Sequence, residues 1–165
     1  LITALLSLKT AGKQEVAFLG LEDRNLLDRR FIGYLKALEA CDLPSEERLF
    51  LRAPGTTEQI EAHLEVYYRK HQTLPAAVLC ETSGLGFRLL RFAAEKGVKV
   101  PEQLSVIAIG SSRFSPLSYP SLSAIEVPLY EMGYTGCQLL FDIFEGKQPQ
   151  SIVTLEWDFV PRGSS

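Results

Sequence analysis

Residues 76–83 read Ala76-Ala77-Val78-Leu79-Cys80-Glu81-Thr82-Ser83. The run Ala76–Cys80 is apolar without a break, which is typical of a strand buried on both faces of a parallel sheet. Thr82 or Ser83 is a suitable N-cap for a helix that follows at once and runs to Gly97. A buried strand joined directly to a helix is the unit from which parallel α/β sheets are built.

The same alternation of strand and helix continues on both sides of this unit. The patterns predict strands at Glu15–Gly20, Arg48–Arg52, Ala76–Cys80, Ser105–Ile109, Ala124–Val127 and Ser151–Val160, and further helices at Leu1–Ala11, Asp23–Ala40, Thr56–His71 and Leu129–Gly146. The sequence therefore predicts an α/β fold with a doubly wound parallel sheet. A Pro/Ser-rich loop over Ser112–Ser123 interrupts the alternation, and loops of this length inside a compact domain are usually functional.

Such a sheet binds its ligand at the carboxyl ends of the strands. The candidate binding segments are therefore those that follow each strand: Leu21–Asn25, Ala53–Gly55, Glu81–Ser83 and Gly110–Arg113.

Composition limits the classes of function. The 165 residues include 46% hydrophobic and 22% charged side chains, which is ordinary for a globular domain. A net charge of −3 and a pI near 5.5 argue against direct binding to nucleic acid. No apolar run reaches the roughly 18 residues of a membrane span. The three cysteines, Cys41, Cys80 and Cys137, lack CxxC spacing and are expected to be reduced, packed thiols of a cytoplasmic protein.

Catalytic and cofactor motifs are absent from the sequence. There is no P-loop and no G-x-S-x-G elbow, and Gly84-Leu85-Gly86 is too short for a dinucleotide fingerprint and falls inside a predicted helix. His63 and His71 have no carboxylates spaced to complete a metal site. Cys80 ends a buried strand, where core packing is a better reading than a nucleophile. We therefore predict no cofactor, no metal and no enzymatic activity.

Several stretches share one family pattern. Arg30–Leu38 fits Arg-x-x-Gly-[aromatic]-x-x-Ala-Leu, and Gly97–Ile107 contains Val-Pro followed by Ser-Val-Ile. Tyr119–Ile125, Glu131-Met132-Gly133 and the closing Val160–Ser164 follow in the same order. Together these stretches resemble the lactose-repressor/galactose-repressor family of bacterial transcription regulators. The closing Val160-Pro161-Arg162-Gly163-Ser164 also has the look of a protease-site tag, so a non-native ending is the alternative at that point.

The resemblance implies the second lobe of a two-lobed, periplasmic-binding-protein-like domain. Residues 1–124 and 151–160 would form this lobe, and residues 125–150 would form the interlobe crossing and a helix of the first lobe. A DNA-binding headpiece would precede Leu1, so the chain would bind operator DNA only through that missing part. The implied function is an effector-sensing, homodimerising module of a repressor, with a sugar or sugar phosphate in the interlobe cleft. The alternatives are a periplasmic sugar-binding transport protein and a small doubly wound enzyme.

The resemblance also implies site residues. Arg30 would anchor the effector, with Arg29 as a competing candidate and an Arg–carboxylate tie between helices as the structural alternative for Arg30. The predicted effector-binding residues are Arg30, Thr82, Ser111, Leu26, Pro54, Val127 and Leu129. Thr82-Ser83 replaces the family's Asn-Asp, and Gly110-Ser111 stands where the family has an aspartate. These departures favour an anionic effector or a site that has lost its ligand.

The family dimerises through the helix after the third strand and the loop after the fourth. The corresponding residues here are Leu85, Phe87 and Arg88, with Tyr119 in the segment Ser115–Pro120. An exposed Leu85/Phe87 pair beside small glycines would suit a flat interface between identical subunits. Ordinary core packing is the alternative, because Leu85 and Leu89 have i, i+4 spacing.

Overall fold

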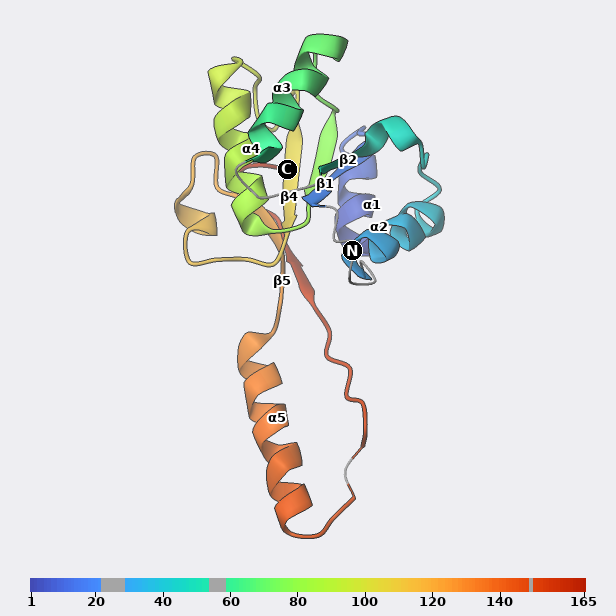
Figure 1. The fold of residues 1–165 in the computed structure, drawn as a ribbon, viewed down its shortest axis with the longest axis vertical. Coiled ribbons are helices and arrows are strands. Elements are labelled where there is room, and N and C mark those ends of the chain that lie inside the picture. Colours follow the sequence, from blue (N-terminus) through green and yellow to red (C-terminus); the bar gives the residue numbers. More distant parts are fainter. Residues whose placement is uncertain (22–28, 54–58, 149) are drawn as a thin grey trace.

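A six-stranded sheet forms the centre of the molecule, in the order β2-β1-β3-β4-β5-β6 (Figure 1). The structure is a computed structural model that describes residues 1–21, 29–53, 59–148 and 150–165. Its strands are β1 Val16–Leu21, β2 Phe50–Ala53, β3 Ala77–Cys80, β4 Ser105–Ile109, β5 Ser123–Glu126 and β6 Asp158–Val160. Its helices are α1 Ile2–Thr10, α2 Arg29–Ala40, α3 Ile60–His71, α4 Ser83–Glu95 and α5 Leu129–Phe144. The predicted α/β fold is confirmed.

Strands β1 to β5 are all parallel, and β6 alone is antiparallel. In the centre of the sheet, Val78 of β3 pairs with Ala17 of β1 and with Val106 of β4. The final strand pairs with β5, Ile125 opposite Phe159. The predicted parallel sheet is confirmed for β1 to β5, and β6 is antiparallel because the chain returns to the sheet beside the strand by which it left.

Alternating side chains of each strand enter two separate cores. Ala77 and Leu79 of β3 pack in the core under α1 and α2, whereas Val78 and Cys80 pack in the core under α3 and α4. Every residue of β3 is buried, as the unbroken apolar run predicts. Tyr34 of α2 is also fully buried, and its hydroxyl donates to the Val16 carbonyl at 2.6 Å. Burial raises the pKa of this phenol.

Helix α5 lies apart from the sheet (Figure 1). It begins shortly after β5 and projects beyond the carboxyl ends of the parallel strands, and none of its residues is buried. The large apolar side chains that it exposes are Leu129, Tyr130, Met132, Tyr134, Leu140, Phe141, Ile143 and Phe144. Within the described residues, the returning segment lies against only one side of this helix, so most of its apolar side chains are uncovered.

The chain returns from α5 to the sheet as an extended segment. The predicted strand Ser151–Val160 was too long, because only Asp158–Val160 lies beside another strand. The segment 151–157 runs back past α5 without a pairing partner among the described residues.

Other element boundaries differ from the predictions by a few residues. A short 3₁₀ helix, Glu47–Leu49, occupies the start of the predicted strand Arg48–Arg52. The loop Ser112–Ser123 also contains a 3₁₀ turn, Ser115–Leu117. The predicted helix starts at residues 23–28 and 56–58 lie outside the described residues.

The closing residues are part of the fold. Ser164 is fully buried, donates to the Val106 carbonyl at 2.6 Å and accepts from the Ser123 amide at 2.9 Å. The Arg162 guanidinium donates to the Leu122 carbonyl at 2.9 Å. These contacts favour the family's closing signature over a tag remnant. In the part of the chain that the structure describes, no helix is long and apolar enough to cross a membrane.

Candidate functional site

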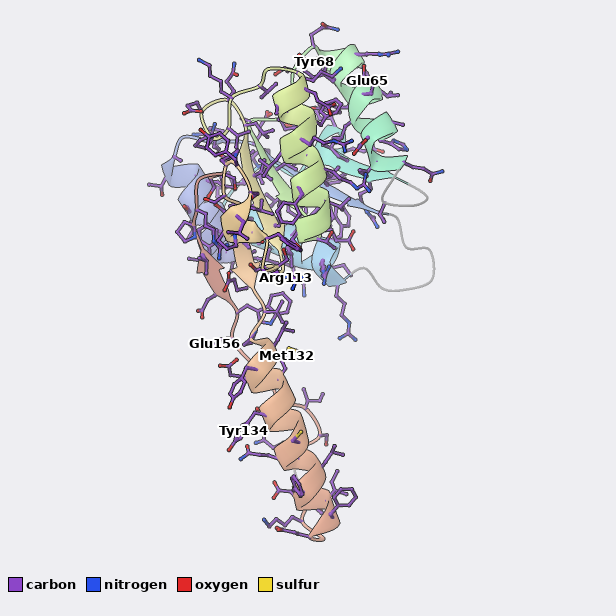
Figure 2. All side chains as sticks on the ribbon, turned by 90° about the vertical axis from the view of Figure 1, so that its left-hand side faces the viewer. Glu65, Tyr68, Arg113, Met132, Tyr134 and Glu156 are labelled. Carbon is purple, nitrogen blue, oxygen red and sulfur yellow. The ribbon has the colours of Figure 1, made fainter. Side chains whose placement is uncertain are left out.

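The carboxyl ends of the parallel strands form the edge of the sheet that faces α5. Arg113, which follows β4, lies at this end of the sheet, and Met132 and Tyr134 of α5 lie beyond it (Figure 2). Glu65 and Tyr68 of α3 lie at the opposite end (Figure 2). The binding segments predicted after each strand therefore meet at one edge, which we call the carboxyl edge.

Arg30 reaches this edge from the first turn of α2. Its Nη1 donates to the Glu81 backbone carbonyl at 2.9 Å, directly after β3. Its side chain has no carboxylate partner among the described residues. The described contact of Arg30 is therefore with a backbone carbonyl, and the Arg–carboxylate tie between helices stays an alternative. The other guanidinium donors have no hydrogen-bond partner among the described residues.

Glu81 holds a carboxylate at the same position. Its Oε2 accepts from the Leu21 amide at 2.9 Å, across the end of β1. A Cβ on Gly20 would lie 2.9 Å from this Oε2 and 2.5 Å from Cε1 of Phe18, so only glycine leaves room for the Glu81 side chain. Sequence reasoning included Glu81 in a strand-end segment but did not assign it a role. The missed signal was a charged residue directly after an unbroken apolar strand.

Arg30 lines a pocket of about 300 Å³ at the carboxyl edge. The pocket is formed by Leu1, Arg29, Arg30, Ile109, Ile125 and Trp157. Both arginine candidates therefore reach the same space. The one tryptophan of the chain, Trp157, is 45% exposed and offers an aromatic face there.

A second pocket, of about 360 Å³, lies at the start of α5. It is lined by Ser111, Ser112, Arg113, Glu126, Val127 and Leu129. Three of the predicted effector-binding residues, Ser111, Val127 and Leu129, thus come together. They line a different pocket from Arg30.

Glu126 joins this second pocket to the end of the chain. Its Oε1 accepts from Arg162 Nη2 at 2.5 Å. The hydrogen bond from Arg162 is the main cause that lowers the pKa of Glu126, and the Ser111 hydroxyl contributes in the same direction.

Three further predicted residues contribute less or lie outside the described residues. The Thr82 hydroxyl caps α4 by accepting from the Leu85 amide at 3.3 Å, and Thr82 lines neither of the two pockets above. Leu26 and Pro54 lie outside the described residues.

The predicted dimer surface needs one correction. Leu85 is only 1% exposed and packs in the core between α4 and the sheet, so the expectation of an exposed Leu85/Phe87 pair was wrong. The i, i+4 spacing with Leu89 turns this side chain inward. Gly86 is packed tightly, because a Cβ there would lie 2.9 Å from Leu122.

Phe87 and Arg88 lie at the surface of α4, on a shallow depression with Gly84 and Arg91. Arg88 donates to Glu61 of α3 at 3.0 Å. Tyr119 is fully exposed, and its neighbours Leu117 and Phe114 are also largely exposed. The exposed apolar side chains in the loop after β4 are consistent with a dimer surface, which stays a prediction and no longer includes Leu85.

The cysteines and histidines form no reactive group in the described part of the chain. No cluster of three or more His, Cys, Asp or Glu side chains that could hold a metal occurs there. Burial raises the pKa of the Cys80 thiol, so Cys80 stays protonated. Cys137 is exposed on α5, so the expectation that all three thiols are packed was wrong for this one.

Comparisons with known proteins identify the family. Residues 6–165 match the periplasmic binding protein-like domain. The HTH-type transcriptional repressor CytR of Escherichia coli (strain K12) is 29% identical over 147 residues, which cover 88% of this chain and 43% of the repressor. The chain thus spans less than half the length of this relative.

Solved structures of LacI-family regulators have the same fold as this chain. A sugar-binding transcriptional regulator (LacI family) from Escherichia coli, complexed with phosphate, superposes with a TM-score of 0.83 at 26% identity over 99% of this chain and 59% of that one. The transcriptional regulator CelR, in a cellobiose complex, superposes with a TM-score of 0.80 at 22% identity over 96% of this chain and 49% of that one. The chain therefore belongs to the periplasmic binding protein-like domain family, in the form carried by LacI-family transcription regulators.

Proposed function

We propose that this chain is the effector-binding and dimerising part of a bacterial transcription repressor. The observation that carries the proposal is the carboxyl edge: two pockets lie there, and α5, with no buried residue, projects from it. In this proposal residues 1–124 and 151–160 form one lobe. Residues 125–150 cross to a second lobe, whose remaining part covers the apolar face of α5.

The effector is bound between the two lobes at the carboxyl edge. The LacI-family structure bound to phosphate and the CelR structure bound to cellobiose support a sugar or a sugar phosphate as the ligand class. Arg30 and Ser111 contribute from the lobe described here, and Val127 and Leu129 contribute from the crossing. We propose no catalytic role for any of these residues.

Signalling follows from a shift between lobe arrangements. A ligand that binds the closed arrangement better than the open one increases the closed population. The change in lobe angle repositions a DNA-binding headpiece outside this chain, which places the protein in the cytoplasm with operator DNA. The coupling free energy is −RT times the natural logarithm of the ratio of effector affinities in the two states.

Two copies pair through the surface formed by Phe87, Arg88 and Tyr119. This surface combines aromatic side chains and arginine, the residue types enriched in protein interfaces. A homodimer would give each operator half-site its own headpiece.

The test is operator binding by the full-length regulator in the presence of neutral sugars and their phosphates. We expect at least one compound to change the operator affinity by tenfold or more, and Arg30→Ala to abolish that change while the protein stays folded. If no compound changes operator affinity and none binds by calorimetry, the proposed function is wrong.

A further inference from the structure

We propose that Glu81 makes the effector site selective for neutral, hydroxyl-bearing ligands over anionic ones. The inference rests on the proposed function, because it concerns the ligand of the same site. It identifies a specificity-determining residue that the sequence alone does not assign.

The Glu81 carboxylate is held in a fixed position. The Leu21 amide donates to Oε2 at 2.9 Å, and the bare backbone of Gly20 leaves the space in which the side chain lies. The amide of Glu81 itself donates to the Leu19 carbonyl at 2.8 Å, so its backbone continues the pairing between β3 and β1. A fixed carboxylate loses little further freedom when a ligand binds.

The two oxygens of this carboxylate differ in their hydrogen-bond partners. The only bond to the carboxylate within the described residues is that from the Leu21 amide to Oε2, so Oε1 has none there. An ionised carboxylate only accepts hydrogen bonds. The ligand group that fits Oε1 is therefore a donor, such as a sugar hydroxyl.

Arg30 places a donor group beside this acceptor. Its Nη1 lies 2.9 Å from the backbone carbonyl of Glu81, so the guanidinium and the carboxylate belong to the same strand end. A hydroxyl can accept from Arg30 and donate to Glu81 at the same time. A fully ionised phosphate can only accept from Arg30, and its charge is repelled by the nearby carboxylate.

The charge balance of the edge therefore differs from the one that the sequence suggests. Arg30 alone favours an anionic effector. The structure adds a negative charge beside Arg30, and this offsets one of the two positive charges that Arg29 and Arg30 bring to this edge. Adjacent positive and negative groups instead match the donor and acceptor of each sugar hydroxyl.

The experiment compares full-length wild type with Glu81→Gln. The glutamine amide oxygen can still accept from the Leu21 amide, so this variant removes the charge and keeps the hydrogen bond that positions the side chain. Titration calorimetry is run with cellobiose, a set of neutral monosaccharides and the matching sugar 6-phosphates. Glu102→Gln, at an exposed position before β4, is the matched control for loss of one negative charge.

We expect wild type to bind a neutral sugar at least tenfold more tightly than its phosphate. In Glu81→Gln the neutral sugar should bind about 10- to 100-fold more weakly, as for loss of one charge-assisted hydrogen bond. The phosphate should bind as well as before or better. The ratio of the two affinities should thus fall or invert, whereas Glu102→Gln should leave it unchanged.

Two results would overturn the inference. A wild type that prefers phosphates would show that Glu81 does not set the charge of the ligand, and an equal loss for both ligand classes would show a merely structural role. In either case operator release by the bound ligand would leave the proposed function standing. If no compound binds wild type at all, both the proposed function and this inference fail.

Discussion

Arg162 holds the two strands that join the sheet to α5, and its removal gives a quantitative test. Its Nη1 donates to the carbonyl of the fully buried Leu122, and its Nη2 donates to Glu126. Arg162→Met keeps the apolar stem of the side chain and removes both donors. The variant leaves a buried carbonyl without its side-chain donor and ends an ion pair.

The magnitude follows from the exposure of the two partners. An unsatisfied buried carbonyl costs about 1–3 kcal/mol. The Glu126 side chain is 38% exposed and that of Arg162 is 16% exposed, so solvent screens the ion pair to about 0.5–1 kcal/mol. We expect the free energy of unfolding to fall by about 1.5–4 kcal/mol. For a chain of this size that corresponds to a decrease of about 3–16 °C in Tm.

Urea unfolding followed by the fluorescence of Trp157 measures the loss, because this single tryptophan directly precedes β6. Glu126→Gln is the control, since its amide oxygen still accepts from Arg162. It should cost no more than about 1 kcal/mol, the screened value of the pair.

The pH dependence has a definite sign. The pKa of Glu126 is lower in the folded chain than in the unfolded one. Its contribution is therefore fully present above the ordinary glutamate value of about 4.3 and is lost as pH falls through the folded pKa. Wild type and Glu126→Gln should differ most at neutral pH and converge in acid. If Arg162→Met costs less than about 0.5 kcal/mol, or no more than Glu126→Gln, the reasoning about the buried carbonyl is refuted.

Three further outcomes are expected. Leu85→Ala should lower the free energy of unfolding by about 2–5 kcal/mol because it empties a core position, whereas Phe87→Ala should weaken dimerisation with little effect on stability. Chemical denaturation measures the first effect and sedimentation the second, and the reverse pattern would contradict the assignment of Leu85 to the core. The 165-residue chain should show no tight complex with duplex DNA in a low-salt mobility-shift assay, and such a complex would contradict the argument from its net charge of −3. The same chain should self-associate at tens of micromolar through the apolar face of α5, and Phe141→Glu should reduce this association; a monomer by sedimentation velocity would count against it.

Much of the sheet could be predicted because its strands are buried on both faces. Ser105–Ile109 agrees with β4 at both ends, since an unbroken apolar run has clear limits. The length of β6 could not be predicted, because the apolar residues of 151–157 lie along the excursion to α5 rather than in the sheet. The local sequence pattern does not distinguish an apolar segment that packs outside the sheet from one that pairs with a neighbouring strand.

The site could be predicted only in outline. The rule that ligands bind at the carboxyl ends predicted the segment Gly110–Arg113, whose Ser111 lines a pocket at that edge, whereas Arg30 and Val127 came from the family resemblance. The sequence showed a charged residue directly after an apolar strand, but the role of Glu81 could not be assigned from it, because its position depends on the space over Gly20 and on the Leu21 amide of a neighbouring strand. Leu85 was misjudged for a related reason, since only the packed structure shows which side of α4 faces the sheet.

Strands β5 and β6 form an antiparallel pair, so the chain departs for α5 and comes back at a single place on the sheet. In topological terms the excursion is a hairpin whose turn has been expanded to hold a helix. The last pair of the register is Glu126 with Asp158. A two-residue Asn-Gly turn placed shortly after this pair would close the hairpin directly. The sheet and its four covering helices would then form a free-standing domain that retains Arg30 and Glu81 and no longer exposes the apolar helix.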